Sequence, residues 1–399
     1  MTEVTGPTGV TQVAGADRPA ALKSRLVHSE ALTHYDFGPD HPMAPGRVRN
    51  AVSLARHLGV LDRLDVVPQP EVDLELLRTV HDDDYIAAVQ QGKPHARYGL
   101  GGSDNPVFPG MHEVAARLTM ASVEAARSVW SGETLRASNI SGGLHHAMPA
   151  RTSGFCVYND IAVAIRWLLD QGCPRVAYVD VDVHHGDGVQ AIFYDDPRVM
   201  TVSLHETPAC LFPGTGFADE IGGPDALGTA VNLALPPGTT DAGWLRAFHA
   251  VVPAVLRAHQ PSILVTQHGC DSHEHDPLAD LDLSVDGQRA SYLALADLAD
   301  ELCGGRWMSM GGGGYSVTDV VPRAWAHLLG VVSGEPVPAE TVIPEAWRDE
   351  IGTYAPRLMT DRADTGYLPF EDGVRGGSRL DQAIVATRAA VFPHWGLAP

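Results

Sequence analysis

Short β-branched runs that alternate with longer amphipathic stretches restrict the fold of this chain more than any other feature. The runs typical of strands lie at 138–141, 175–182, 199–204, 262–267 and 306–310, and those typical of helices lie at 160–172, 244–259 and 287–302. Strands that alternate with helices indicate βαβ units. The sequence therefore predicts an α/β fold with a central, mostly parallel sheet that is covered by helices on both faces.

No linker or internal repeat divides the 399 residues. We expect one domain over residues 25–399, preceded by a flexible tail over residues 1–24 that lacks an apolar period. Beyond about Glu335 the chain is charged and interrupted by prolines, which predicts an extension of short helices and loops on the surface.

Composition narrows the partners and the compartment. The formal net charge of −21 disfavours nucleic acid and anionic lipid and would suit a cationic substrate, although acidity also serves solubility. The five cysteines are scattered without a Cys-x-x-Cys pair, so neither a disulfide framework nor a thiolate zinc site is indicated. We find no signal segment and no apolar run long enough to span a membrane, and we expect a cytoplasmic protein with no membrane partner.

Polar clusters follow four of the expected strands. The four clusters are GGLHHA after 138–141, HHGDG after 175–182, HGCDSHEHDP after 262–267 and GGGGY after 306–310. Ligands of open parallel sheets bind beyond the carboxyl ends of the strands. We therefore expect the four segments to meet at one site.

The string AYVDVDVHHGDGVQ over 177–190 predicts a metal centre. With a strand period of two, Asp180, Asp182 and His184 would share one face, and Asp271 is the natural third ligand beside Asp182 and His184. Buried carboxylates are costly unless they are paired or bind a metal. Three protein ligands leave a position open, as in catalytic zinc sites, with iron(II) as the second choice. Salt bridges or turn caps are the alternative interpretation.

Histidines and a tyrosine supply candidate acid–base groups. His145 or His146 can move a proton near neutral pH, and Asp180 and Asp187 are available to fix the ring tautomers. Tyr315 follows four glycines, which favour a tight turn close to a ligand, and its phenol can donate to a carbonyl oxygen that becomes an oxyanion. A phosphate-binding loop is disfavoured, because the one Gly-Lys pair is followed by Pro94.

Several of these motifs, in this order, resemble the histone deacetylase family of metal-dependent deacylases, and within it the bacterial acetoin-utilisation deacetylases. The matching segments between about Leu26 and Leu329 are HYDFGPDHPMAPGRVR, GGLHHA, SGFCVYND, YVDVDVHHGDGVQ, VMTVSLHE, FPGTG, GCDSHEHDPL and MGGGGYS. The resemblance implies a three-layer αβα fold of the arginase and deacetylase type, one catalytic zinc, and hydrolysis of an acetylated amine.

The resemblance also implies roles for individual residues. The metal ligands would be Asp182, His184 and Asp271; the histidine dyad His145 and His146, with the second as general base; their carboxylate partners Asp180 and Asp187; and the group that polarises the acetyl carbonyl Tyr315. The substrate tunnel would be lined by Gly154, Phe155 and Phe212, with Asp104 at the rim. Structural potassium would bind near Asp180, Asp182, His184, Ser203 and Leu204, with a second ion near Phe193.

The substrate is the open part of the prediction. Acetyl-lysine on a protein, an acetylated polyamine and another acylated small molecule all suit the expected site. Polyamine-selective relatives can carry an acidic residue after an Asp-Pro pair, whereas Leu278 follows Asp276-Pro277 here, which favours acetyl-lysine. From other classes, an amidinohydrolase would need two metals, and a non-catalytic reader of acetylated partners would not need the full set of reactive residues.

Overall fold

The computed structural model describes residues 22–373 and 377–399. The tail predicted over residues 1–24 lies outside the described residues except for its last three. Within them, eight strands form one sheet in which every pair is parallel. The strand order is β2 (Asp65–Val67), β1 (Arg25–Val27), β3 (Arg136–Asn139), β8 (Trp307–Met310), β7 (Ile263–Gln267), β4 (Val176–Asp180), β5 (Val199–Glu206) and β6 (Ala230–Leu235).

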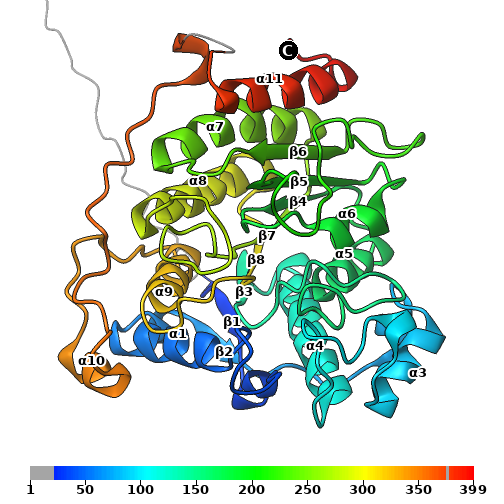
Figure 1. Cartoon of the computed structure of the whole chain (residues 1–399), viewed down its shortest axis with the longest axis vertical. Helices are drawn as coiled ribbons and strands as arrows, with labels where there is room; N and C mark the ends of the chain where they lie inside the picture. Colours follow the sequence, from blue (N-terminus) through cyan, green and yellow to red (C-terminus); the bar gives the residue numbers. More distant parts are fainter. Residues whose placement is uncertain (1–21, 374–376) are drawn as a thin grey trace, which may run out of the picture.

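Helices cover both faces of this sheet, which gives the expected three layers (Figure 1). One face carries α1 (Gly46–His57), α7 (Asp241–His259), α8 (Val285–Cys303) and α9 (Val320–Val332). The other carries α2 (Leu74–Arg78), α3 (Asp83–Gln91), α4 (Met111–Trp130), α5 (Asp160–Asp170) and α6 (Asp187–Phe193). Short 3-10 helices lie at Glu30–His34, Leu61–Arg63, Ala96–Tyr98, Phe370–Asp372 and Phe392–Trp395.

Alternation along the strands divides the apolar side chains between two cores. In β4, Ala177 and Val179 pack in the core beneath α7 and α8, whereas Val176 and Tyr178 pack in the core beneath α4 and α5. Successive side chains of a strand point to opposite faces, so a strand covered on both sides is apolar throughout. The β-branched runs of the sequence have this origin.

The expected strands and helices are present with small shifts of their ends. Capping accounts for two of the helix starts: the side chain of Asn159 accepts from the amide of Ala162 at the start of α5, and that of Ser284 accepts from Gly287 at the start of α8. The expected strand over 175–182 is shorter, because β4 ends at Asp180. Asp182 and His184 therefore lie on a turn beyond the strand, and the period-two argument that grouped them with Asp180 was wrong.

The C-terminal region contains two further helices, α10 (Glu345–Ile351) and α11 (Arg379–Val391). Helix α11 begins at the cap Ser378 and packs against β6 and α7. The hydroxyl of Thr387 donates to the carbonyl oxygen of Asn232 in β6 over 2.6 Å. Within the described residues, no helix combines the length and apolar character needed to cross a membrane.

Candidate active site

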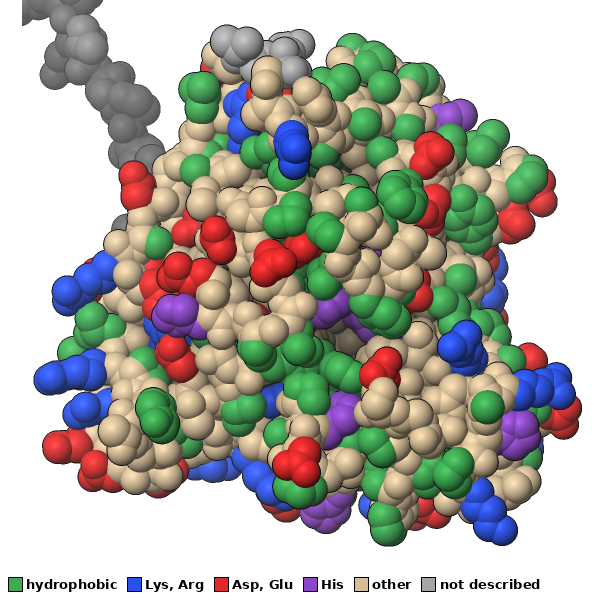
Figure 2. All heavy atoms as spheres, viewed as in Figure 1, with side chains coloured by type: hydrophobic (Ala, Val, Ile, Leu, Met, Phe, Trp, Pro, Cys, Tyr) green, Lys and Arg blue, Asp and Glu red, His purple; other side chains and the backbone are tan. Residues whose placement is uncertain are grey.

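The four polar clusters lie together because their strands are neighbours. Strands β3, β8, β7 and β4 are consecutive in the sheet, and all point the same way. The segments that follow them therefore meet at one edge. Figure 2 shows a hollow near the middle of this face, with histidine side chains inside it and hydrophobic side chains beside it.

The three predicted metal ligands converge at the bottom of this site. One donor atom each of Asp182, His184 and Asp271 lies within 4.8 Å of the others, and all three residues are buried. The Nδ1 atom of His184 is 3.1 Å from a carboxylate oxygen of Asp182 and 3.1 Å from one of Asp271. Turns after β4 and β7 thus bring together residues that are about ninety positions apart.

The charge of this group is unbalanced. Among the described residues, neither Asp182 nor Asp271 forms an ion pair with a lysine or arginine. Their ionisable partners are His184, at 3.1 Å from both carboxylates, and His145, whose Nε2 lies 4.0 Å from Asp182. Although burial favours the neutral ring, both carboxylates raise the pKa of His184 to about 10. Burial, together with the charge of Asp182, raises the pKa of Asp271. This group is stabilised by added positive charge. Two carboxylates and one imidazole are also a donor set that fits a divalent cation such as zinc.

His145 and Asp180 form the first histidine–carboxylate pair. The Nδ1 atom of His145 is 2.7 Å from Asp180, whose carboxylate also accepts from the hydroxyl of Tyr178 over 2.6 Å. Although burial favours the neutral ring, the charges of Asp180 and Asp182 raise the pKa of His145 to about 9. This ring is a proton carrier at neutral pH.

His146 and Asp187 form the second pair with the opposite electrostatic balance. The Nδ1 atom of His146 is 2.7 Å from Asp187. Burial and the neighbouring charge of His145, whose ring centre is 3.9 Å away, lower the pKa of His146 to about 4 in spite of Asp187. A neutral ring whose Nδ1 is engaged by a carboxylate leaves Nε2 free to accept a proton.

Tyr315 reaches the site from the glycine run after β8. Its ring lies edge-on to Phe155, with centres 5.9 Å apart. Burial, together with the charge of Asp271, raises the pKa of its phenol well above 10, so the hydroxyl keeps its proton. A Cβ atom at Gly313 would lie 1.9 Å from a carboxylate oxygen of Asp271, so only glycine fits there. The run passes close to the ligands, as the sequence predicts.

Four further residues contact the site residues and were not predicted from the sequence. Asp160 accepts from the amides of Gly143 and Leu144 at the turn before the dyad, and Gln267 donates to Asp182 over 2.8 Å. Asp276 accepts from the amide of Tyr315 over 2.7 Å. The guanidinium of Arg47, which is buried, donates to the carbonyl oxygens of Gly312 and Gly314.

These groups open to solvent through a pocket of about 230 Å³. Its walls are formed by Asp104, His146, Gly154, Phe155, His184, Leu211, Phe212, Leu278 and Tyr315. The ring of Phe212 lies edge-on to His146 with centres 5.0 Å apart. A Cβ atom at Gly154, where φ is +51°, would lie 2.4 Å from the ring of His146. The structure thus places every predicted tunnel and rim residue on this pocket.

Of the residues predicted to lie near potassium, Asp182 and His184 belong to the metal-ligand group itself, and the others lie on neighbouring elements. Asp180 in β4 pairs with Ser203 in β5, and Leu204 follows Ser203 in the same strand. Phe193 ends α6, and the guanidinium of Arg166 lies 5.1 Å from the centre of its ring.

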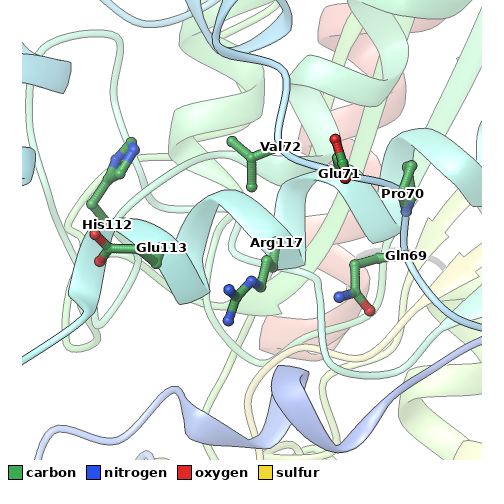
Figure 3. A pocket seen from close by; sticks show the side chains of 7 residues that line it. All are labelled: Gln69, Pro70, Glu71, Val72, His112, Glu113 and Arg117. Atoms are coloured by element: carbon green, nitrogen blue, oxygen red, sulfur yellow. The ribbon is translucent and has the colours of Figure 1, made fainter.

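A second hollow of about 430 Å³ lies away from these strand ends (Figure 3). It is lined by Gln69, Pro70, Glu71 and Val72 from a loop and by His112, Glu113 and Arg117 from α4. It contains none of the predicted site residues, and His112 is already engaged by the hydroxyl of Tyr158 at 2.9 Å. The chemistry therefore belongs to the smaller pocket.

Comparison with known proteins agrees with this geometry. A family model, the histone deacetylase domain, matches residues 41–332. An acetoin utilization protein AcuC from Bacillus subtilis (strain 168) is 39% identical over 381 residues, which cover 92% of this chain and 98% of the relative. AcuC from Staphylococcus aureus (strain MSSA476) is 34% identical over 360 residues, covering 84% of this chain and 92% of the relative.

Two solved structures have a similar fold. An HDAC homologue from Aquifex aeolicus superposes with a TM-score of 0.79 at 27% identity, covering 92% of this chain and 100% of that one. The HD domain of HDA15 superposes with a TM-score of 0.77 at 24% identity, covering 94% and 95%. The second likeness concerns the fold alone.

Proposed function

Because this chain belongs to the histone deacetylase family, and is therefore a deacetylase that acts on an acetylated substrate, we propose that it hydrolyses the side-chain amide of N6-acetyl-lysine in proteins. One observation carries the proposal. A pocket of about 230 Å³ with apolar walls at Phe155, Phe212 and Leu278 reaches His184 of the buried Asp-His-Asp group, with a neutral histidine and a protonated phenol among its lining residues. Such a pocket suits the methylene chain of a lysine with a carbonyl at its inner end.

A metal ion is part of this proposal. Asp182, His184 and Asp271 would hold it, with zinc as our first choice and iron(II) as the second. When bound, such an ion polarises a carbonyl and makes water more acidic. We also propose structural potassium near Asp180, Asp182, His184, Ser203 and Leu204 and near Phe193.

The remaining chemistry falls to side chains of this chain. Asp187 fixes the ring of His146 so that Nε2 accepts a proton from the attacking water. The hydroxyl of Tyr315 donates a hydrogen bond to the acetyl oxygen as negative charge develops on it. Asp180 supports the charged form of His145, which delivers a proton to the departing amine. The products are acetate and the free amine.

The walls and rim of the pocket support a lysine side chain as the substrate. Phe155 and Phe212 would flank its methylenes, and Asp104 would accept from the peptide backbone at the rim. Leu278, which is 37% exposed, offers no charge to the second amine of a polyamine. Acetylated polyamines are the competing substrate class.

We further propose that residues 25–399 act as one catalytic domain. The contacts of α11 with β6 and α7 support this organisation, as does the single sheet.

The test is acetate release from an acetyl-lysine peptide and from acetylputrescine, each with and without a chelator. We expect chelator-sensitive turnover of the peptide. The Tyr315→Phe protein with full metal content should be slower by roughly 10²- to 10³-fold. Turnover of acetylputrescine alone would move the function to small amines. Metal-dependent acetate release from either substrate excludes a non-catalytic reader, and one metal ion per chain excludes a two-metal amidinohydrolase.

A further inference from the structure

Asp361 of the C-terminal extension reaches the interior beside the active site. It lies beyond residue 332, where the match to the family model ends. Its backbone is exposed, but its carboxylate turns inward, so that 20% of the side chain remains exposed. One oxygen accepts from His273 at 3.0 Å and from the amide of Val285 at 2.8 Å, and the other accepts from Arg323 at 2.5 Å.

His273 connects Asp361 to the loop of the metal ligands. It stands two residues after Asp271, and its side chain is fully buried. Its Nδ1 accepts from the amide of His275 at 3.0 Å, so Nε2 carries the hydrogen that Asp361 accepts. The carbonyl oxygen of His273 accepts from the amide of Asp276, and Asp276 in turn accepts from the amide of Tyr315.

Arg323 connects Asp361 to the segment that carries the phenol. It lies in α9, shortly after Tyr315, and its side chain is 3% exposed. It pairs with Asp361 and, over 2.6 Å, with Asp319 just before the helix. Although partial burial opposes ionisation, His273 and Arg323 hold the pKa of Asp361 well below its usual range.

The extension is itself tied down at this point. The carboxylate of Asp286 in α8 accepts from the hydroxyl of Thr360 at 2.7 Å, from the amide of Asp361 at 3.0 Å and from the amide of Ala363 at 3.1 Å. Because these bonds hold the backbone of Asp361 in place, its carboxylate can restrain His273 and Arg323 and need not move with them.

We propose that Asp361 is a positioning residue of the active site, which sets the Asp271 loop and the Tyr315 segment relative to each other through His273 and Arg323. The inference rests on the proposed roles of Asp271 and Tyr315. It also gives the C-terminal extension a task in catalysis. Partners that orient metal ligands typically change metal affinity or activity by about 10- to 100-fold when they are removed.

The experiment compares the full-length, metal-loaded proteins Asp361→Ala and Asp361→Asn with the wild type. The matched control is Asp349→Ala, which removes an exposed carboxylate from α10 in the same extension. Three quantities are measured: kcat and KM for an acetyl-lysine peptide, the dissociation constant of Zn²⁺ by competition with a chromogenic chelator, and the melting temperature.

For Asp361→Ala we expect kcat to fall and the Zn²⁺ dissociation constant to rise, each about tenfold or more, with KM within twofold of the wild type. Asp361→Asn should lie between, because an amide oxygen still accepts from His273 but carries no charge for Arg323. Asp349→Ala should match the wild type throughout. The Asn variant also guards against an Ala variant that does not fold.

A lower melting temperature with unchanged kcat and unchanged Zn²⁺ affinity would overturn the inference, because Asp361 would then brace the fold without acting on the site. An Asn variant as impaired as the Ala variant in melting temperature alone would do the same. If the wild type released no acetate, the proposed function would fail instead, while the Zn²⁺ measurement would still decide the role of Asp361.

Discussion

Two neighbouring groups of charged side chains differ in how their charge is balanced. One is the metal-ligand cluster of Asp182, His184 and Asp271, and the other is the brace of Asp361, His273 and Arg323. Both combine carboxylates with a buried imidazole, and they are two residues apart along the chain at Asp271 and His273. The brace contains an arginine whose charge is fixed. The metal-ligand cluster has no such cation among the residues that the structure describes.

This difference in charge balance distinguishes buried carboxylates with a structural role from buried carboxylates that bind a ligand. A carboxylate that is paired with arginine and backbone amides needs nothing more from solution. Two buried carboxylates that share one imidazole need a further cation that binds reversibly, either a proton or a metal ion. The high pKa of His184, about 10, is the signature of that demand.

The largest effect should come from removing a charge of the metal-ligand cluster. We expect Asp182→Ala to lower kcat/KM for an acetyl-lysine peptide by roughly 10³-fold or more, because the bound ion would lose a ligand and its chemistry. The measurement is initial-rate acetate release alongside metal content by elemental analysis. Without metal, the variant should be less stable than the wild type, because His184, Gln267 and the amide of Gly313 lose the buried carboxylate that they contact. Retention of more than a tenth of the activity would show that Asp182 is not a ligand.

Much of the fold could be predicted from the sequence, because strands covered on both faces are apolar throughout. The runs at 199–204 and 262–267 correspond to β5 and β7 for this reason. Strands β1 and β2 have three residues each, too few to show a period, and they gain their place by pairing with distant segments. Helix α4 buries most of its residues, and only a narrow polar stripe that includes Glu113, Arg117 and Arg127 reaches solvent.

For the active site, too, local sequence patterns could be predicted and contacts between distant residues could not. The clusters after the strands are local strings, and the sheet order explains why they meet. Arg47, Gln267 and Asp361 are single residues whose partners lie 265, 85 and 88 positions away, and no local pattern reports such contacts. Even Asp182 and His184 were grouped by a strand period that ends two residues earlier. Turns beyond the strand ends bring the ligands together, and glycines are the only indication of these turns in the sequence.

The second effect should come from unbalancing the brace. We expect Arg323→Gln to lower the free energy of unfolding by roughly 2–3 kcal/mol, because it leaves Asp361 and Asp319 facing a buried site without their cation. Urea denaturation of the metal-free proteins measures it. Arg257→Gln is the control, because its pair with Glu301 is half-exposed and such pairs contribute less than about 1 kcal/mol. Equal losses in the two variants would remove the distinction drawn between the brace and an ordinary surface pair.

The smallest effect concerns the proton that replaces the metal. The pKa of His184 in the folded, metal-free protein is about 10, above the ordinary value of about 6.5 for an unfolded chain. A histidine with a raised pKa contributes stability that is complete below about 6.5 and is lost as the pH rises toward 10. His184 should therefore make the free energy of unfolding of the metal-free protein fall between pH 7 and pH 9, at a slope of up to roughly 1 kcal/mol per pH unit. His145, whose pKa is raised to about 9, adds a slope of the same sign.

Asp271→Asn should flatten this slope, because one of the two carboxylates that hold the proton on His184 becomes neutral. The same substitution should make the metal-free protein more stable than the wild type at pH 9, where the wild type has two buried carboxylates and has begun to lose its proton. Saturating Zn²⁺ should reduce the slope in the wild type to the part that His145 contributes, since the metal takes the place of the proton on His184. Urea denaturation at four pH values between 7 and 9 decides the matter. An equal slope in the wild type and in Asp271→Asn would mean that the metal-ligand cluster is already balanced without a metal, as the brace is.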